Sequence, residues 1–371
     1  MKSETKKAKG QKISVIVGII VVVVVVVIGT LLTIGKFGQK SINLAKVNQK
    51  SFELLDSSCI NSKTCVAIGS NLSSTAGIIV FTSDGGKLWH KTVINNVSNF
   101  ISVGCSNSSS FCIAIGDSKS KAVIFEFRSL NWFPIDSPLI NAFSSNVACN
   151  QTGCELVGTV SNSQYLFEFN GAKWDTFKIE TPYSLLGISS LSCVSIYFCM
   201  AEATGLPEKN LIFNRQYLLK FDGVSWESLE LPKPIFKIGS ISCISVDYCV
   251  ALGEVKNVAT NYKYILSFNG NSWKVESLKL QTEYLGSISC ASPLFCISTL
   301  TNSEHYLQYN GKKWVELNLS SNFGYLGPVN CIQVNSCISL VSPSSSNNLS
   351  YSIRDNITIF SGTRWSASLL N

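Results

Sequence analysis

The chain has 371 residues and a formal net charge of +7 at pH 7, which comes from 30 basic and 23 acidic side chains. Nine of the basic residues and one of the acidic residues precede Ser51, which leaves 21 basic against 22 acidic residues in the remainder. A main body so close to neutral gives no support for nucleic-acid binding, which would require a basic face, so we expect no nucleic-acid partner.

The N-terminus combines a basic tail with a long uncharged stretch. Five lysines lie within residues 1–12, and no charged residue occurs from Ile13 to Gly35. About 20 apolar residues are enough for a helix to cross the hydrocarbon core of a bilayer, whereas the core of a cleaved signal peptide has roughly 7 to 15. We therefore predict a transmembrane signal anchor at 13–35 and keep a cleaved signal peptide as the alternative.

Charge also predicts the orientation of this anchor. Positive residues close to a membrane span tend to stay in the cytoplasm, and the lysines of residues 1–12 outweigh Lys36 and Lys40 on the other side. The tail 1–12 should therefore be cytoplasmic. Residues 36–50 should form a linker, and residues 51–371 should lie outside the cytoplasm as part of a single-pass protein of the cell membrane.

Beyond the linker, two independent markers show that the chain is built from repeats. All fourteen cysteines fall in close pairs, and each pair is followed by one of the seven tryptophans. The pairs are Cys59 with Cys65, Cys105 with Cys112, Cys149 with Cys154, Cys193 with Cys199, Cys243 with Cys249, Cys290 with Cys296, and Cys331 with Cys337. The tryptophans are Trp89, Trp132, Trp174, Trp226, Trp273, Trp314 and Trp365. Two markers that agree on seven copies indicate a seven-fold repeat.

Each repeat contains the signals of four strands. The segment before the first cysteine alternates polar and apolar residues (Tyr284–Cys290), and a short apolar run follows the second (Cys249–Gly253). A third aromatic-rich run (Tyr217–Phe221) ends in Asp-Gly or Asn-Gly, which favours a type I′ hairpin to a fourth strand that carries the Trp. We therefore predict an all-β fold over 51–371, a seven-bladed β-propeller with four antiparallel strands in each blade.

The cysteine pairs are predicted to be disulfides within each repeat. Members of a pair are close enough in sequence to face each other across a tight loop between the first and second strands, within the reach of a disulfide. An exported chain also lies in a compartment where disulfides persist. The alternative, zinc binding, would require Cys-x2-Cys spacing or histidine partners, and the chain has only His90 and His305. We expect no metal site and no cofactor.

The first repeat contains the segment Thr82-Ser-Asp84-Gly-Gly86-Lys-Leu-Trp89. It resembles the Asp-box, S/T-x-D-x-G-x-x-W, which lies on the third-to-fourth-strand hairpin in sialidases, sortilin-type propellers and photosystem II assembly-factor propellers. The whole pattern also resembles secreted bacterial propellers of Cys-paired (BNR-like) repeats. The resemblance implies the propeller fold over 51–371, although only the first repeat keeps the Asp. It implies no single activity, because these families share an architecture.

The regular positions of the repeat are interpreted as structural. Each Trp should begin the outer strand and pack between neighbouring blades, where its large side chain buries much area. Glycines four residues before the first cysteine, or six residues before it in the fourth repeat, should allow close approach of the inner strands near the axis. These glycines are Gly187, Gly239, Gly286 and Gly327.

Irregular positions are where we expect binding. The link between the second and third strands is long in repeats four, five and seven (204–214, 254–262 and 342–355), and these links should share the face opposite the disulfide loops. Aromatic residues gather where that face meets the inner strands: Phe52, Phe100, Phe143, Tyr183, Phe236, Tyr284, Phe323 and Tyr325. They predict an aromatic-rimmed site for peptide or glycan. The alternative is that they plug the blade interfaces.

The resulting hypothesis is a monomeric, non-enzymatic binding or scaffold propeller for an extracytoplasmic protein or glycan. A glycan-binding adhesin is one alternative, and a sialidase-like glycoside hydrolase is another. A sialidase needs an arginine cluster for the substrate carboxylate, but this chain has only Arg128, Arg215, Arg354 and Arg364, none of them in a recognisable family motif. We expect Arg128 and Arg364 to lie on the third-to-fourth-strand hairpins, away from the predicted aromatic site.

The predicted topology can be tested on intact cells or spheroplasts. Protease added from outside should digest the propeller and leave the N-terminal tail intact, because only the propeller is exported. Antibodies against each end would follow the two parts. Full protection of the propeller would reverse the assigned orientation.

Overall fold

The computed structural model describes the chain in stretches that together cover most of the propeller. These are residues 52–71, 76–119, 121–138, 143–151, 153–161, 163–181, 184–206, 215–255, 263–278, 284–301, 303–319, 324–342, 357–362, 364–368 and 370. The predicted tail, anchor and linker (1–50) lie outside the described residues. Within the described stretches, no helix has the length and apolar character needed to span a bilayer.

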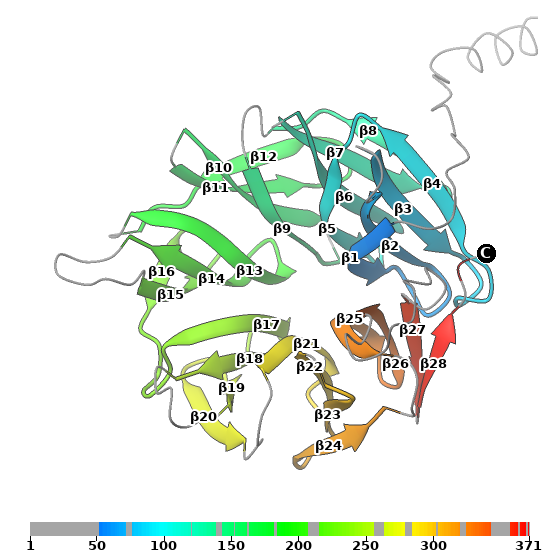
Figure 1. Ribbon diagram of the computed structural model, residues 1–371. Coiled ribbons are helices and arrows are strands. Elements are labelled where there is room, and N and C mark those ends of the chain that lie inside the picture. The colour runs from blue at the N-terminus through cyan, green and yellow to red at the C-terminus, as the bar shows by residue number, and fades with distance from the viewer. Residues whose placement is uncertain are drawn as a thin grey trace, which may run out of the picture. The chain divides into compact units, whose positions relative to one another are not determined.

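The described strands form seven four-stranded antiparallel sheets, each made of strands that are consecutive in sequence (Figure 1). Blade 1 contains β1 (Phe52–Cys59), β2 (Cys65–Asn71), β3 (Ala76–Thr82) and β4 (His90–Asn95). Blade 2 contains β5 (Asn99–Ser106), β6 (Phe111–Ser118), β7 (Lys121–Arg128) and β8 (Asn131–Ile135). Blade 3 contains β9 (Phe143–Cys149), β10 (Cys154–Val160), β11 (Ser163–Phe169) and β12 (Trp174–Lys178).

The remaining blades repeat this plan. Blade 4 contains β13 (Leu185–Ser195), β14 (Phe198–Gly205), β15 (Arg215–Phe221) and β16 (Trp226–Leu229). Blade 5 contains β17 (Lys237–Ser245), β18 (Tyr248–Glu254), β19 (Lys263–Phe268) and β20 (Trp273–Leu278). Blade 6 contains β21 (Tyr284–Ser292), β22 (Phe295–Thr301), β23 (His305–Tyr309) and β24 (Trp314–Asn318). Blade 7 contains β25 (Tyr325–Gln333), β26 (Ser336–Ser342), β27 (Ile357–Ser361) and β28 (Trp365–Ser368).

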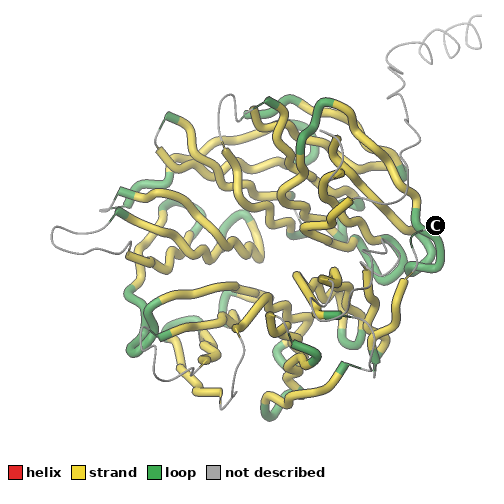
Figure 2. Tube along the Cα trace, viewed as in Figure 1, coloured by secondary structure: helices red, strands yellow, loops and turns green. Residues whose placement is uncertain are grey.

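The blades are arranged in a ring with the first strand of each blade innermost. Each inner strand contacts the next, from β1 to β5 and onward to β25, and β25 contacts β1. Figure 2 shows that strands make up most of this ring and that loops lie at the blade ends. The predicted seven-bladed, four-stranded propeller is therefore confirmed.

An aromatic pair recurs where the third strand of a blade meets the fourth. In blade 3, Phe169 lies directly opposite Trp174, with ring centroids 4.8 Å apart. Blades 2, 4, 5, 6 and 7 have the same pair at 5.1 to 5.4 Å. The tryptophans also pack on the preceding blade, as Trp132 does in a cluster with Val66 and Ile68 of blade 1. The predicted structural role of the tryptophans is confirmed.

Serine side chains connect neighbouring inner strands. Ser242, which precedes the first cysteine of blade 5, accepts a hydrogen bond from the backbone N–H of Cys290 in blade 6 at 3.0 Å. Two residues earlier, Ser240 accepts from the N–H of Ile288 at 3.2 Å. Similar bonds link blades 1 to 2, 2 to 3, 4 to 5 and 6 to 7. These bonds satisfy N–H groups that the open edge of an inner strand would otherwise leave unpaired.

In blade 1, Asp56 occupies the position that Ser240 occupies in blade 5. Asp56 accepts hydrogen bonds from the N–H of Val103 at 2.9 Å and from the hydroxyl of Ser102 at 3.1 Å. Burial raises the pKa of this carboxyl to about 6, although these bonds and one from the N–H of Ser57 act in the opposite direction.

Among the described strands none is shared between the first and last blades, and side chains connect these two blades. Trp89 of blade 1 donates its indole N–H to the hydroxyl of Ser368 in blade 7 at 2.8 Å, and Ser368 donates to the carbonyl of Gly86. A Cβ at Gly86 would lie 2.2 Å from the Cδ1 atom of Ile359, so only glycine allows this approach. The core around Ala67 and Ile78 continues into blade 7 through Ile338.

The inner-strand glycines have a different role from the predicted one. A Cβ at Gly187 or Gly239 would meet no atom within 4 Å, so neither position is an approach of inner strands. These glycines instead lie where the pairing of the first two strands shifts register, beside β-bulges. Gly286 does make a close approach, but to Thr299 of its own blade.

We predict that Ser368→Ala destabilises the propeller. Trp89 would lose its acceptor, and leaving a buried donor unpaired costs about 1–3 kcal/mol. The matched control is Ser366→Ala in the same strand, where the serine is exposed and an effect within about 0.5 kcal/mol is expected. Denaturant midpoints of both variants and the parent chain provide the comparison. Equal midpoints for the two variants would show that this contact does not stabilise ring closure.

Candidate binding surface at the disulfide loops

Each blade has one disulfide that joins its first two strands. The bridges are Cys59 to Cys65, Cys105 to Cys112, Cys149 to Cys154, Cys193 to Cys199, Cys243 to Cys249, Cys290 to Cys296, and Cys331 to Cys337. The two cysteines of each pair lie directly opposite each other in the strand pairing, and their Cα atoms are 3.9 to 4.1 Å apart. No described cysteine is free. The predicted pairing is confirmed, and seven disulfides indicate an oxidising location outside the cytoplasm.

The second cysteine of each disulfide also belongs to the apolar core, a role that the sequence interpretation did not assign to it. All seven are at most 4% exposed: Cys65, Cys112, Cys154, Cys199, Cys249, Cys296 and Cys337. Several of them pack in a cluster with the preceding blade: Cys112 with Val66 of blade 1, Cys199 with Val157 of blade 3, Cys296 with Val250 of blade 5, and Cys337 with Phe295 of blade 6. The bridges therefore fill space between blades as well as closing a loop.

A cavity of about 480 Å³ lies where the inner strands end at these disulfides. The first cysteine of all seven blades lines it, together with apolar residues two positions earlier, such as Leu191, Ile241 and Ile288. Its volume lies within the roughly 300–1,000 Å³ range of ligand-binding pockets.

Two loops of each blade meet at this end of the ring. In blade 1 the N–H of Gly85, on the β3–β4 hairpin, donates to the carbonyl of Lys63 on the disulfide loop at 2.9 Å. In blade 4 a Cβ at Gly223 would contact Tyr197, and in blade 6 one at Gly311 would contact Leu294. The disulfide loops and the third-to-fourth-strand hairpins therefore form one surface, which we call the disulfide face.

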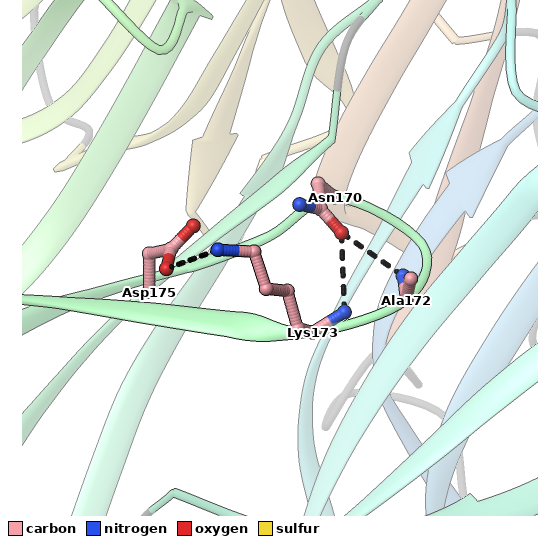
Figure 3. Close-up of polar contacts among 4 residues, drawn as sticks. All are labelled: Asn170, Ala172, Lys173 and Asp175. Carbon is pink, nitrogen blue, oxygen red and sulfur yellow. Dashed lines mark hydrogen bonds and ion pairs between the residues drawn. The ribbon is translucent and has the colours of Figure 1, made fainter.

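The hairpins on this face are held by a side-chain cap at the start of the turn. In blade 3 the side-chain oxygen of Asn170 accepts from the N–H groups of Ala172 and Lys173 at 3.0 and 3.1 Å, and Lys173 pairs with Asp175 at 2.9 Å (Figure 3). Asp222, Asn269 and Asn310 form the same turn. In these four hairpins only the glycine takes a positive φ, so the predicted hairpins are confirmed but their type I′ geometry is wrong.

The hairpin of blade 1 is longer and is held by Asp84. Its carboxylate accepts from the hydroxyl of Thr82 at 2.8 Å and from the N–H groups of Lys87 and Leu88 at 3.0 Å. The bonds from Leu88 and Thr82 lower the pKa of Asp84. This carboxylate is therefore occupied in shaping the turn.

The cavity mouth is apolar on one side and polar on the other. On blades 4 to 7, the residue after the first cysteine is Val194, Ile244, Ala291 or Ile332, and all four line the cavity. On blades 2 and 3 the mouth is lined by Asn107, Asn150 and Gln151 instead. The seven-fold repeat therefore supports a surface without seven-fold symmetry.

A buried carboxyl group lies behind the polar side of the mouth. Glu155 is fully buried, and one oxygen accepts from the amide of Asn150 at 2.6 Å while the other has no hydrogen-bond partner among the described residues. Burial raises the pKa of Glu155 to about 8, so the group is largely protonated at neutral pH. Burial also raises the pKa of Glu202 in blade 4 to about 7.

The side chains of four of the eight aromatic residues of the predicted rim lie among the described residues, and two of these four are buried. Phe52 and Phe100 are buried and belong to the cores between blades 7 and 1 and between blades 1 and 2, so the plug alternative holds for them. Phe236 is exposed and Tyr325 is half-buried. The backbones of Phe143 and Tyr284 lie in β9 and β21, but their side chains, like the whole of Tyr183 and Phe323, lie outside the described residues.

The long links that motivated this prediction also lie mostly outside the described residues. The residues that sequence reasoning missed are those at the tips of the disulfide loops, including Tyr197 and Leu294. Their signal in the sequence was an apolar residue at the turn of a loop, where polar residues are usual.

Glu155 generates a prediction about pH. Between about pH 4.5 and 8 the folded chain keeps a proton that the unfolded chain has lost, so this group makes stability fall as pH rises through that window. Glu155→Gln keeps an acceptor for Asn150 and removes the charge. It should therefore melt several degrees above the parent at pH 8, since 1 kcal/mol corresponds to about 2–4 °C.

The difference between Glu155→Gln and the parent should shrink toward pH 5, and melting curves across this range would measure it. The control is Glu53→Gln, which changes an exposed carboxylate of β1. If the melting temperatures of the parent and of Glu155→Gln changed in parallel with pH, the raised pKa of Glu155 would be contradicted.

No protein-family model and no curated protein sequence matches the chain. Solved structures with the same fold include YCF48 bound to D1 peptide, with 14% identity, a TM-score of 0.56, and 87% of this chain and 100% of that chain covered. YCF48 from Cyanidioschyzon merolae has 14% identity and a TM-score of 0.53, with coverage of 80% and 95%. The β-propeller domain of the Trilobed protease from Pyrococcus furiosus, described as having an open velcro topology, has 9% identity and a TM-score of 0.59, with coverage of 86% and 96%. Identities this low show a shared fold.

Proposed function

We propose that this protein is a membrane-anchored, extracytoplasmic and non-enzymatic module that binds a polypeptide. The observation that supports this most directly is the cavity of about 480 Å³ at the disulfide face, a face that also carries exposed apolar residues on its loops. Rigid scaffolds commonly bind partners through loops, and the disulfides hold these loops in place.

The proposed location and partner class have separate support. The disulfides require an oxidising compartment, and the uncharged stretch 13–35 is long enough for the anchor that would hold the propeller there. A propeller of the same fold, YCF48, has been solved bound to a peptide. That likeness supports a polypeptide, rather than a glycan, as the ligand class.

The described arginines favour binding over glycoside hydrolysis. Arg128 forms an ion pair with Glu126 at 3.7 Å, and its guanidinium lies 5.0 Å from the ring centroid of Phe133. Arg364 lies in blade 7, just before the fourth strand. Arg128 is therefore already paired within its own blade, and both arginines lie at third-to-fourth-strand hairpins, as expected from the sequence.

The Asp-box resemblance fits a structural role in this proposal. The hairpin from Thr82 to Trp89 contacts blade 7 through Gly86 and Trp89, at the seam where the ring closes. We assign it to ring closure, and this explains why the first repeat alone keeps the full motif.

The proposed function is tested by comparing ligand classes on the full-length chain in detergent micelles. The chain would be screened against a displayed library of random linear peptides and against a glycan array. We expect enriched peptides that bind the purified chain with affinities near the micromolar range, and no specific glycan signal.

The control in this screen is the chain after reduction and alkylation, which should lose peptide binding because its loops are released. Glycan binding without peptide binding would favour the adhesin alternative. Turnover of a sialoside substrate by the purified chain would favour the hydrolase.

A further inference from the structure

Among the described residues, exposed apolar tips of the disulfide loops are confined to one arc. They lie on four consecutive blades: Tyr197 (67% exposed), Val246 (49%), Leu294 (65%) and Val334 (49%). Val224, on the hairpin beside Tyr197, is 86% exposed. We call these five residues the apolar arc. Leu88 and Leu130 are also exposed, but they lie on hairpins of blades 1 and 2 without an apolar loop tip beside them. Contiguous apolar surface on a soluble domain marks an interaction site.

The apolar arc continues into the cavity. Below the tips, Val194, Ile244 and Ile332 line the mouth of the cavity on the same blades. These side chains continue the apolar arc toward the axis, although most of the exposed lining of the cavity itself is polar.

The other blades present basic side chains at the same end. On blade 1, Lys63 is exposed on the disulfide loop and Lys87 on the hairpin. The loops and hairpin ends of the whole face also present Arg128, Lys173, Lys312, Lys313 and Arg364, whereas the carboxylates there are Asp84, Asp175, Asp222 and Asp247. Asp84 and Asp222 accept hydrogen bonds within their own turns, and Asp175 pairs with Lys173. These contacts leave the carboxylates ionised, and Arg128 itself pairs with Glu126, but the seven basic residues named here still outnumber the four carboxylates, so the net charge of these loops is positive.

We propose that the disulfide face binds a linear, acidic polypeptide segment, whose apolar side chains seat on the apolar arc and in the cavity mouth while its carboxylates face the basic loops of blade 1. This inference rests on the proposed function and adds the surface and the chemistry of the partner. It places the site on the face opposite the predicted aromatic rim.

Two features favour a polypeptide over the other partners that this surface could attract. An anionic bilayer would also be attracted to the positive charge of this face. However, a flat bilayer surface cannot enter the cavity and contact the apolar residues that line it. A second copy of this chain would bring the same positive charge to the interface, which like-charge repulsion disfavours. An extended peptide supplies alternating side chains and fits the cavity.

The test uses the full-length chain in detergent micelles and the displayed library of random linear peptides. Peptides enriched by the parent should be rich in Asp or Glu together with Leu, Phe or other large apolar residues. Tyr197→Ser combined with Leu294→Ser should weaken binding of the enriched peptides roughly tenfold or more, as expected for interface anchors. Lys63→Glu combined with Lys87→Glu should weaken it as well, and this loss should diminish at high salt.

Matched control variants lie at the opposite end of the blades. Leu186→Ser with Leu206→Ser changes exposed apolar residues near the start of β13 and the end of β14, and Lys119→Glu with Lys121→Glu reverses charge at the β6–β7 link. These variants should bind the peptides as the parent does. Tyr284→Ala with Tyr325→Ala tests the predicted aromatic rim in the same assay.

The outcomes separate the inference from the proposed function. The inference would be overturned, and polypeptide binding left intact, if the enriched peptides bound the disulfide-face variants as tightly as the parent. The same conclusion would follow if binding were lost only in the opposite-face variants or in the variant at Tyr284 and Tyr325. Enrichment of basic peptides would do the same. If no peptide is enriched, both are wrong. Binding to phosphatidylglycerol vesicles that is lost with the disulfide-face variants, without peptide binding, would assign the face to a membrane.

Discussion

The propeller depends on how its inner strands satisfy their exposed backbone edges. An inner strand pairs with only one neighbour, so the N–H groups of its other edge need partners from the adjacent blade. Serines such as Ser240 and Ser242 supply these partners and fix the register of one blade against the next. Each such bond contributes only about 1 kcal/mol, but an unpaired N–H would cost more than the bond provides. These hydrogen bonds therefore fix the relative position of neighbouring blades, whose other contacts are mainly apolar.

The seam between blades 7 and 1 is formed differently. There the indole of Trp89 and the hydroxyl of Ser368 provide the polar contact, and the hairpin of Asp84 supplies the shape that Gly86 needs to pack on Ile359. No disulfide crosses this seam, because each lies within its own blade. The polar contacts of closure thus come from a single modified hairpin, while each blade has its own disulfide.

The sequence predicted the fold well because cysteine pairs, tryptophans and Asn-Gly or Asp-Gly turns recur with the period of a blade. It predicted the site less well. Phe100 and Tyr197 are both aromatic, yet one is buried between blades and the other lies at a loop tip, and composition alone does not separate them. The buried carboxyl of Glu155 occupies a position that is aliphatic in other repeats, such as Ile113 and Val250, and only the packed structure shows its desolvation.

Each described sheet is made of consecutive strands, and among the described strands none belongs to the sheet of another blade. A whole repeat therefore corresponds to one whole blade. Duplication or deletion of one segment from the start of one first strand to the start of the next would add or remove a complete blade with its disulfide, tryptophan and serine contacts. The ring could then change its number of blades by recombination without breaking any sheet, while the hairpin of blade 1 would remain at the seam.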